Sequence, residues 1–178
     1  MDKVKRTLFL DRDGVINEHV KNGYVLSAND FKIKDDFFKE IGKIAFHFDY
    51  IIVITNQSPL GRGLLSLKAL YEINLKLLRK AKLYSINITD ILYSPGQDNN
   101  CVTRKPNTGM FEYALRSYND INLDSSIFIG DSYSDYQAAK KLGVSYYNLK
   151  GADEFYKSLN IENNFDNINE LIKNIIFE

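Results

Sequence analysis

Thr7-Leu8-Phe9-Leu10-Asp11-Arg12-Asp13-Gly14 joins a short apolar run to two acids and a glycine. The run has the length and apolar character of a strand buried on both faces of a parallel sheet. Further runs of this kind follow at residues 50–54, 91–93, 127–129 and 145–149. The alternation of strand-length runs with longer helical segments is typical of βαβ units. It predicts a Rossmann-like α/β/α fold with a central parallel sheet.

The segments between these runs carry helix signals. Apolar residues recur at three- and four-residue steps over 37–48 and 67–81, which predicts two helices with one face in the core. Ser134 followed by Gln137 indicates a capping box for a further helix, which Gly143 would end. Helices are therefore expected between the first and second, the second and third, and the fourth and fifth strands.

No internal repeat and no linker divides the chain. Residues 168–176 predict a closing amphipathic helix behind an Asn-rich loop at 160–169, so we expect residues 1–178 to form a single domain. Between Asp11 and Thr55, the predicted loop, helix and second strand fill the sequence. No large cap domain is therefore expected.

The composition excludes several classes of protein. The 178 residues include 23 Lys and Arg against 23 Asp and Glu, without a basic block, so a surface that binds nucleic acid is not expected. The single cysteine, Cys101, excludes an intrachain disulfide and a zinc site made of Cys alone. No uncharged apolar stretch approaches about 18 residues, so we expect a cytoplasmic protein that does not bind membranes. We also expect a monomer.

Acidic residues follow the first and the fourth predicted strands. Asp11 and Asp13 precede the turn at Gly14, and Asp131 leaves the fourth strand. The carboxyl ends of parallel strands meet at one edge of the sheet, where open α/β proteins bind ligands. Close carboxylates favour a shared cation, and hard carboxylate oxygens suit Mg²⁺. These three acids are therefore predicted to hold Mg²⁺, although an Asp-x-Asp-Gly sequence taken alone is as typical of a charged turn.

The same acids could carry out phosphoryl transfer. A carboxylate can attack phosphorus to form an aspartyl-phosphate, and a second carboxylate can act as acid and base. Thr55 and Asn56 could donate hydrogen bonds to phosphate oxygens, and Lys105 could supply a positive charge. Taken alone, each of these residues is more typical of a turn or a solvated surface. Asp131 and Asp135 lie at a helix entrance, where one of them is expected to cap the helix.

The order of these motifs resembles that of the haloacid dehalogenase superfamily of phosphohydrolases. The order is Asp-x-Asp-Gly from Asp11, Thr-Asn-Gln from Thr55, Arg-Lys-Pro from Arg104 and Gly-Asp from Gly130. More narrowly, residues 7–149 resemble the heptose-bisphosphate and histidinol-phosphate phosphatase branch. The motifs that carry this narrower resemblance lie at 9–17, 22–25, 54–58, 61–63, 104–106 and 129–131.

The resemblance implies a role for each matching residue. Asp11 would be the nucleophile and Asp13 the general acid and base, while Thr55 and Lys105 would bind the transferring phosphoryl group. Asp11, the backbone carbonyl of Asp13, and Asp131 would hold Mg²⁺. The positions that would contact the rest of the substrate are Lys21, Asn22, Gly23, Tyr24, Asn56, Gln57, Ser58, Arg104 and Ser132.

The chain departs from this branch in the loop before Arg104. Members commonly carry a zinc loop of Cys-x-His followed by Cys-x-Cys, and the matching positions here are Ser94, Gly96, Cys101 and Thr103. One ligand is left where tetrahedral zinc needs four, so we predict no zinc and a loop held by hydrogen bonds.

Two further departures affect the substrate side. Ser132 stands where the heptose enzymes usually have Lys, which removes a positive contact to the substrate. An insertion between Asn17 and Asn22 alters the first substrate loop, and His19 within it could touch the substrate.

The resemblance implies a Mg²⁺-dependent phosphomonoester hydrolase that acts on a small sugar phosphate. The match at 22–25 and 61–63 favours D-glycero-D-manno-heptose 1,7-bisphosphate losing its 7-phosphate, in the supply of activated heptose for lipopolysaccharide or capsule. Histidinol phosphate is the alternative substrate, and the zero net charge disfavours a polynucleotide 3′-phosphatase. A non-catalytic module that binds a sugar phosphate or a protein is the alternative from another class, because the zinc ligands are lost.

Overall fold

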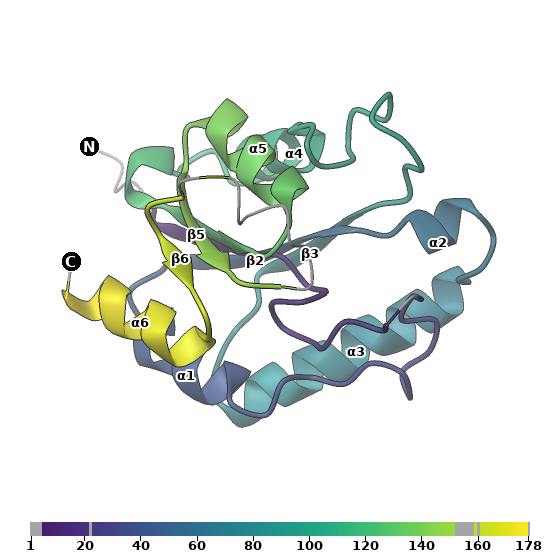
Figure 1. The fold of residues 1–178 in the computed structure, drawn as a ribbon, viewed down its shortest axis with the longest axis horizontal. Helices are drawn as coiled ribbons and strands as arrows, with labels where there is room; N and C mark the ends of the chain where they lie inside the picture. The colour runs from purple at the N-terminus through teal and green to yellow at the C-terminus, as the bar shows by residue number, and fades with distance from the viewer. Residues whose placement is uncertain (1–4, 22, 152–158, 160, 178) are drawn as a thin grey trace.

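The computed structural model describes residues 5–21, 23–151, 159 and 161–177, and their fold is built on a six-stranded sheet (Figure 1). The strands are β1 (Thr7–Leu10), β2 (Tyr50–Asn56), β3 (Asp90–Ser94), β4 (Ile127–Gly130), β5 (Ser145–Leu149) and β6 (Asn164–Phe165). Their order across the sheet is β3-β2-β1-β4-β5-β6, and neighbouring strands pair in parallel. This arrangement confirms the predicted α/β fold with a central parallel sheet.

Helices cover both faces of the sheet (Figure 1). One layer contains α1 (Phe37–Ala45), α3 (Leu67–Leu83) and α6 (Ile168–Phe177), and the other contains α4 (Gly109–Ser117) and α5 (Tyr133–Leu142). A short helix, α2 (Ser58–Gly61), follows β2, and a 3₁₀ turn, η1 (Leu123–Ser125), precedes β4. Because successive side chains of a strand point to opposite faces, Leu8 and Leu10 pack in the first layer and Phe9 in the second.

The start of α5 differs from the sequence prediction. The capping box predicted from Ser134 and Gln137 is wrong, because Ser134 already lies in the first turn of the helix. Ser132 is the N-cap instead: its hydroxyl accepts from the Asp135 N–H at 3.3 Å, and the Asp135 carboxylate accepts from the Ser132 N–H at 3.0 Å. Gly143 ends the helix in the left-handed conformation with φ of 77°, as predicted.

Four of the described elements lie in segments for which the sequence predicts no regular structure. They are α2, α4, η1 and β6. The nine residues of α4 bury only Met110, Phe111 and Ala114, too few to show a helical period in the sequence. β6 has two residues and pairs Phe165 with Leu149 of β5 inside the Asn-rich stretch.

The segment between β1 and α1 lies along α3 rather than folding into a separate layer (Figure 1). Lys76 Nζ on α3 donates to the Ala28 carbonyl at 2.7 Å. Within the described ranges no insertion forms a cap, which confirms that prediction, and no helix there is long and apolar enough to cross a bilayer.

Candidate active site

Three buried carboxylates and one buried lysine meet at the carboxyl ends of the central strands. Asp11 follows β1, Asp131 follows β4, Asp135 lies in the first turn of α5, and one oxygen of each lies within 4.8 Å of the others. Lys105 Nζ lies 2.5 Å from Asp11 Oδ1 and 2.6 Å from Asp135 Oδ1, and it donates to the Ile54 carbonyl at 2.7 Å. We call Asp11, Asp131, Asp135 and Lys105 the acid–lysine centre. The predicted convergence of Asp11, Asp131 and Lys105 is confirmed.

Burial and charge oppose each other in the acid–lysine centre. Burial raises the pKa of Asp11 well above its usual range, and Lys105 only partly offsets this. Burial lowers the pKa of Lys105, but Asp11 and Asp135 outweigh burial, so the pKa is raised and the side chain stays cationic. Burial also raises the pKa of Asp131, opposed by a hydrogen bond from His19. Because one lysine faces three carboxylates, a divalent cation would stabilise their ionised forms.

The donor atoms of this centre fit Mg²⁺. Carboxylate oxygens are the hard ligands that Mg²⁺ prefers. Asp135 already uses both oxygens, since Oδ1 pairs with Lys105 and Oδ2 accepts from the backbone N–H groups of Asp131 and Ser132 at 3.3 and 3.0 Å. Asp11 and Asp131 are therefore the side chains left to ligate a metal, and both belong to the predicted set.

Asp13 contacts a different group of residues. Its carboxylate accepts from Arg12 Nη2 at 2.8 Å, from Gln57 Nε2 at 2.8 Å and from Asn17 Nδ2 at 3.0 Å. Burial raises the pKa of Asp13, but Arg12 and these hydrogen bonds outweigh burial and lower it. Arg12 is itself buried, with its guanidinium 5.5 Å from the ring centroid of Phe31. The metal contact predicted through the Asp13 backbone carbonyl stays a prediction.

The end of β2 positions Lys105. Asn56 Oδ1 accepts from the Lys105 N–H at 3.0 Å, and Asn56 Nδ2 donates to the Lys105 carbonyl at 3.0 Å. Thr55 is buried and its hydroxyl accepts from Gln57 Nε2 at 2.9 Å. The sequence predicts a substrate contact for Asn56, and the structure adds that this side chain holds the backbone of the lysine.

A pocket of about 280 Å³ opens next to Asp13. The predicted substrate residues that line it are Gly23, Tyr24, Asn56, Gln57, Ser58 and Arg104. The sequence does not predict the contributions of Arg12, Val20, Val25, Pro59 and Arg62. Arg62 Nη1 donates to the Tyr24 hydroxyl at 3.1 Å, and its guanidinium lies 6.0 Å from the ring centroid. The motif around Arg62 is visible in the sequence, but its partner 38 residues away is not.

Three predicted substrate residues are not placed in this pocket. Lys21 is exposed and does not line it. Ser132 caps α5 and does not line it either. Asn22 lies outside the described residues. Substrate contacts of these three residues stay predictions.

His19 connects the pocket to the acid–lysine centre. It lines the pocket, and its Nε2 lies 2.7 Å from Asp131 Oδ2. This hydrogen bond raises the pKa of His19, against the effect of burial. Gly14 makes room for the contact: its φ is 95°, and a Cβ there would overlap both Asp131 Oδ2 and His19 Nε2. The glycine is therefore required by geometry.

The positions that match the zinc loop of related enzymes still lie together. Thr103 Oγ1 lies 2.8 Å from Ser94 Oγ and 3.2 Å from Cys101 Sγ, and the Gly96 N–H donates to Ser94 Oγ at 3.2 Å. The contacts with Thr103, followed by those with Ser94, lower the pKa of the Cys101 thiol to about 7. Hydrogen bonds hold this loop, as predicted, and the absence of zinc stays a prediction.

Comparisons with known proteins agree with this site. Residues 7–165 match the family model described as Polynucleotide kinase 3 phosphatase. The D-glycero-alpha-D-manno-heptose-1,7-bisphosphate 7-phosphatase of Photorhabdus laumondii is 34% identical over 151 residues, which cover 80% of each chain. The Campylobacter jejuni protein of the same name is 32% identical over 168 residues, 94% of each chain. The chain belongs to the haloacid dehalogenase-like heptose-bisphosphate phosphatase family.

This phosphatase also matches solved structures of the family. The D,D-heptose 1,7-bisphosphate phosphatase of Bordetella bronchiseptica, solved with magnesium and phosphate, superposes with a TM-score of 0.85 at 26% identity, over 97% of this chain and 98% of the other. The predicted resemblance and the predicted enzyme class are confirmed. The magnesium in that relative agrees with the buried carboxylates of the acid–lysine centre.

Proposed function

We propose that this phosphatase removes the 7-phosphate of D-glycero-D-manno-heptose 1,7-bisphosphate through an aspartyl-phosphate on Asp11. The observation that carries the proposal is the acid–lysine centre next to a pocket lined by Arg62 and Arg104. The first would hold the phosphoryl group that is transferred, and the second would hold the rest of a doubly phosphorylated sugar. The Campylobacter jejuni relative, which is named for this substrate and matches 94% of the chain, supports it.

In the first step, a carboxylate oxygen of Asp11 attacks phosphorus. The bond from phosphorus to the sugar oxygen breaks, and that oxygen leaves with the electron pair and takes a proton from Asp13. Lys105 holds Asp11 at 2.5 Å and, together with the Thr55 hydroxyl, binds phosphoryl oxygens. Mg²⁺ held by Asp11, Asp131 and the Asp13 carbonyl would reduce the repulsion between the carboxylate and the phosphoryl oxygens.

In the second step, a water molecule attacks the phosphorus of the aspartyl-phosphate. Asp13 accepts the proton of this water, the bond between phosphorus and the Asp11 oxygen breaks, and inorganic phosphate leaves. Arg12 and Gln57 favour the ionised form of Asp13, which is the form that this step needs. The proton gained here is the one donated in the next turnover, so the cycle is balanced.

Charge favours the bisphosphate over histidinol phosphate. Arg62 and Arg104 line the part of the pocket that would receive the leaving group, and each can bind phosphate through its guanidinium. The 1-phosphate of the heptose would be attracted to these arginines, whereas the ammonium group of histidinol phosphate would be repelled. The two anomers of the heptose place this phosphate differently, so their relative rates will depend on how it reaches the arginines.

The test is phosphate release, with Mg²⁺ and with EDTA, from the two anomers of heptose 1,7-bisphosphate, histidinol phosphate, fructose 1,6-bisphosphate and a 3′-phosphorylated oligonucleotide. We expect Mg²⁺-dependent release from the heptose, with ³¹P NMR showing that the 7-phosphate is lost. Faster turnover of histidinol phosphate or of the oligonucleotide would contradict the proposed substrate. Binding of the heptose without any release would indicate the non-catalytic module instead.

We further propose that residues 1–178 act as one domain and as a cytoplasmic monomer, since all the groups used above come from one chain. Sedimentation equilibrium should give the mass of a single 20.5 kDa chain at the concentrations used in the assay. A stable dimer with unchanged activity per chain would overturn the oligomeric state alone.

A further inference from the structure

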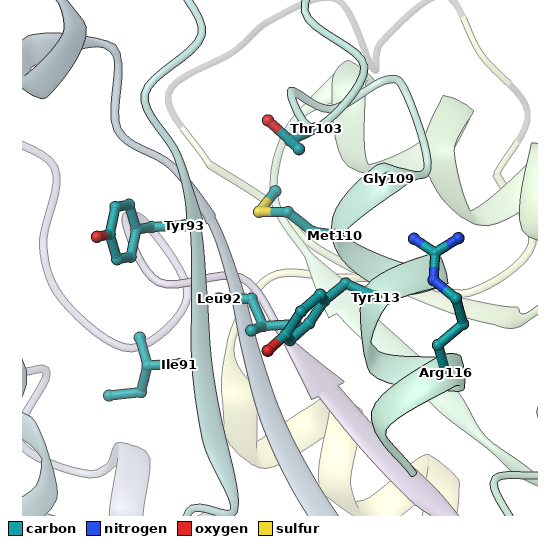
Figure 2. Close-up of a pocket in the computed structure, with 8 residues that line it drawn as sticks. All are labelled: Ile91, Leu92, Tyr93, Thr103, Gly109, Met110, Tyr113 and Arg116. Carbon is teal, nitrogen blue, oxygen red and sulfur yellow. The ribbon is translucent and has the colours of Figure 1, made fainter. Parts of the chain in front are cut away.

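A second pocket lies away from the acid–lysine centre, between β3 and α4 (Figure 2). Its volume is about 310 Å³, within the range of about 300 to 1,000 Å³ that is typical of small-molecule sites. Leu92 of β3 and Met110 of α4 give it an apolar wall. Tyr113, which is 54% exposed, lies on the same side of β3 as these two residues, whereas Tyr93 projects from the other side of the strand (Figure 2). An aromatic ligand would find both an apolar surface and a stacking partner, Tyr113, here.

A cationic side chain belongs to the same pocket. Arg116 lines it, three residues after Tyr113 on α4, and both side chains project from this helix in Figure 2. Arg116 is exposed, and no carboxylate in the described parts of the chain forms an ion pair with it. A guanidinium at an apolar pocket is suited to a planar acid, because it can bind a carboxylate through two parallel hydrogen bonds.

We propose that this pocket binds a planar aromatic carboxylate. The ring would pack on Leu92 and Met110 beside Tyr113, and the carboxylate would pair with Arg116. A phosphorylated sugar offers less apolar surface to this wall than an aromatic ring does, so the ligand class differs from that of the active site.

The pocket shares a loop with the active site. Thr103 and Gly109 line the pocket, and the residues between them include Lys105, whose Nζ reaches Asp11. The Gly109 N–H donates to the Val102 carbonyl at 3.1 Å and closes this loop on itself. A ligand packed against Thr103 and Gly109 would therefore restrain the segment that positions Lys105. We expect its binding to change the rate of phosphate release.

The experiment uses 2-naphthoate as the probe, because the chain contains no Trp and the naphthalene fluorescence can be read without interference. Mg²⁺ and inorganic phosphate are kept at saturating concentrations to occupy the active site. We expect saturable binding that falls about tenfold or more in Arg116→Gln, as for the loss of a charged hydrogen bond. Arg79→Gln, which removes an exposed arginine of α3 outside this pocket, is the matched control and should bind like wild type.

A second variant, a neutral probe and a rate measurement test the proposal further. Tyr113→Ala removes an exposed ring from the pocket and should weaken binding, while circular dichroism confirms that the variant is folded. The neutral 2-naphthylmethanol should bind wild type no better than 2-naphthoate binds Arg116→Gln. Saturating 2-naphthoate should change phosphate release by wild type at least about twofold, and release by Arg116→Gln much less.

The proposal is overturned if wild type shows no saturable binding, or if binding is equal in Arg116→Gln and wild type. It is also overturned if inorganic phosphate displaces the probe, since that would place the probe in the active site. An unchanged rate at saturating probe would overturn the coupling through the shared loop. The binding outcomes do not depend on which sugar phosphate is the substrate, whereas the coupling rests on the proposed function and is measured with the substrate that the enzyme hydrolyses.

Discussion

The acid–lysine centre and the loop from Ser94 to Thr103 are neighbours in the chain but are held together in different ways. In the centre, buried charges face each other, with Lys105 Nζ 2.5 Å from Asp11 Oδ1 and 2.6 Å from Asp135 Oδ1. In the loop, neutral groups face each other, with Thr103 Oγ1 2.8 Å from Ser94 Oγ.

The difference shows which part of this site tolerates substitution. A hydrogen bond between neutral groups contributes only about 1 kcal/mol net, so one set of polar side chains can replace another in the loop. Removing one partner of a buried ion pair costs about 3 to 5 kcal/mol, because the other charge stays buried and unpaired. Removing a charged side chain from the acid–lysine centre should therefore lower the stability much more than removing a hydroxyl from the loop.

The largest effect is expected for Asp11→Asn. The amide is a poor nucleophile, so the rate of phosphate release should fall at least about 10³-fold. Asp124→Asn, an exposed Asp in η1, is the matched control and should retain full activity. If Asp11→Asn kept more than a tenth of the wild-type rate, Asp11 would not be the nucleophile.

Lys105→Met should lower the free energy of unfolding by about 3 to 5 kcal/mol, because Asp11 and Asp135 lose their cation. Urea denaturation measures this loss. The double variant Lys105→Met/Asp135→Asn should recover part of the stability but none of the activity. Equal stability of the single variant and wild type would show that the ion pairs contribute no net stability.

Arg62→Gln tests the pocket beside the centre. We expect KM for the heptose bisphosphate to rise about tenfold, with little change in kcat, because the guanidinium would bind the phosphate that is not transferred. Tyr24→Phe removes only the hydroxyl that accepts from Arg62 at 3.1 Å, so its effect should be smaller. A lower kcat with unchanged KM would instead place Arg62 in the chemical step.

The smallest effect is expected in the loop. Thr103→Val removes the hydroxyl that contacts Ser94 and Cys101, and it should cost about 1 kcal/mol of stability. It should also raise the pKa of Cys101 from about 7, so that alkylation by iodoacetamide reaches half of its maximal rate at a higher pH than in wild type. Wild-type alkylation with a midpoint near the ordinary thiol pKa of about 8.5 would contradict the role of these contacts.

Much of the fold and of the acid–lysine centre could be predicted from the sequence. The bounds predicted for β1 and β5 match the structure, because β1 is an uninterrupted apolar run and β5 is a short run centred on two tyrosines and bounded by a helix-ending glycine. The sequence also predicts that Asp11, Asp131 and Lys105 lie close together, because parallel strands end at one edge of the sheet.

The rest depends on side-chain orientation and long-range packing. The sequence predicts that Asp131 or Asp135 caps a helix, but only the fold reveals that Asp135 does so with one oxygen and pairs with Lys105 through the other. The contact between Arg62 and Tyr24 joins two loops 38 residues apart and has no periodic signal. The nine-residue α4 is likewise too short for its apolar spacing to identify it as a helix.

The most direct test of nucleophilic attack in the acid–lysine centre is to trap the covalent intermediate. The enzyme is mixed with heptose 1,7-bisphosphate and Mg²⁺, quenched within one turnover and treated with borohydride, which reduces an acyl phosphate to an alcohol. Peptide mass spectrometry should then find homoserine at position 11 of the wild type when substrate is present. It should find none there when substrate is omitted. Homoserine at position 131 or 135, or at no position while phosphate is released, would contradict nucleophilic attack by Asp11.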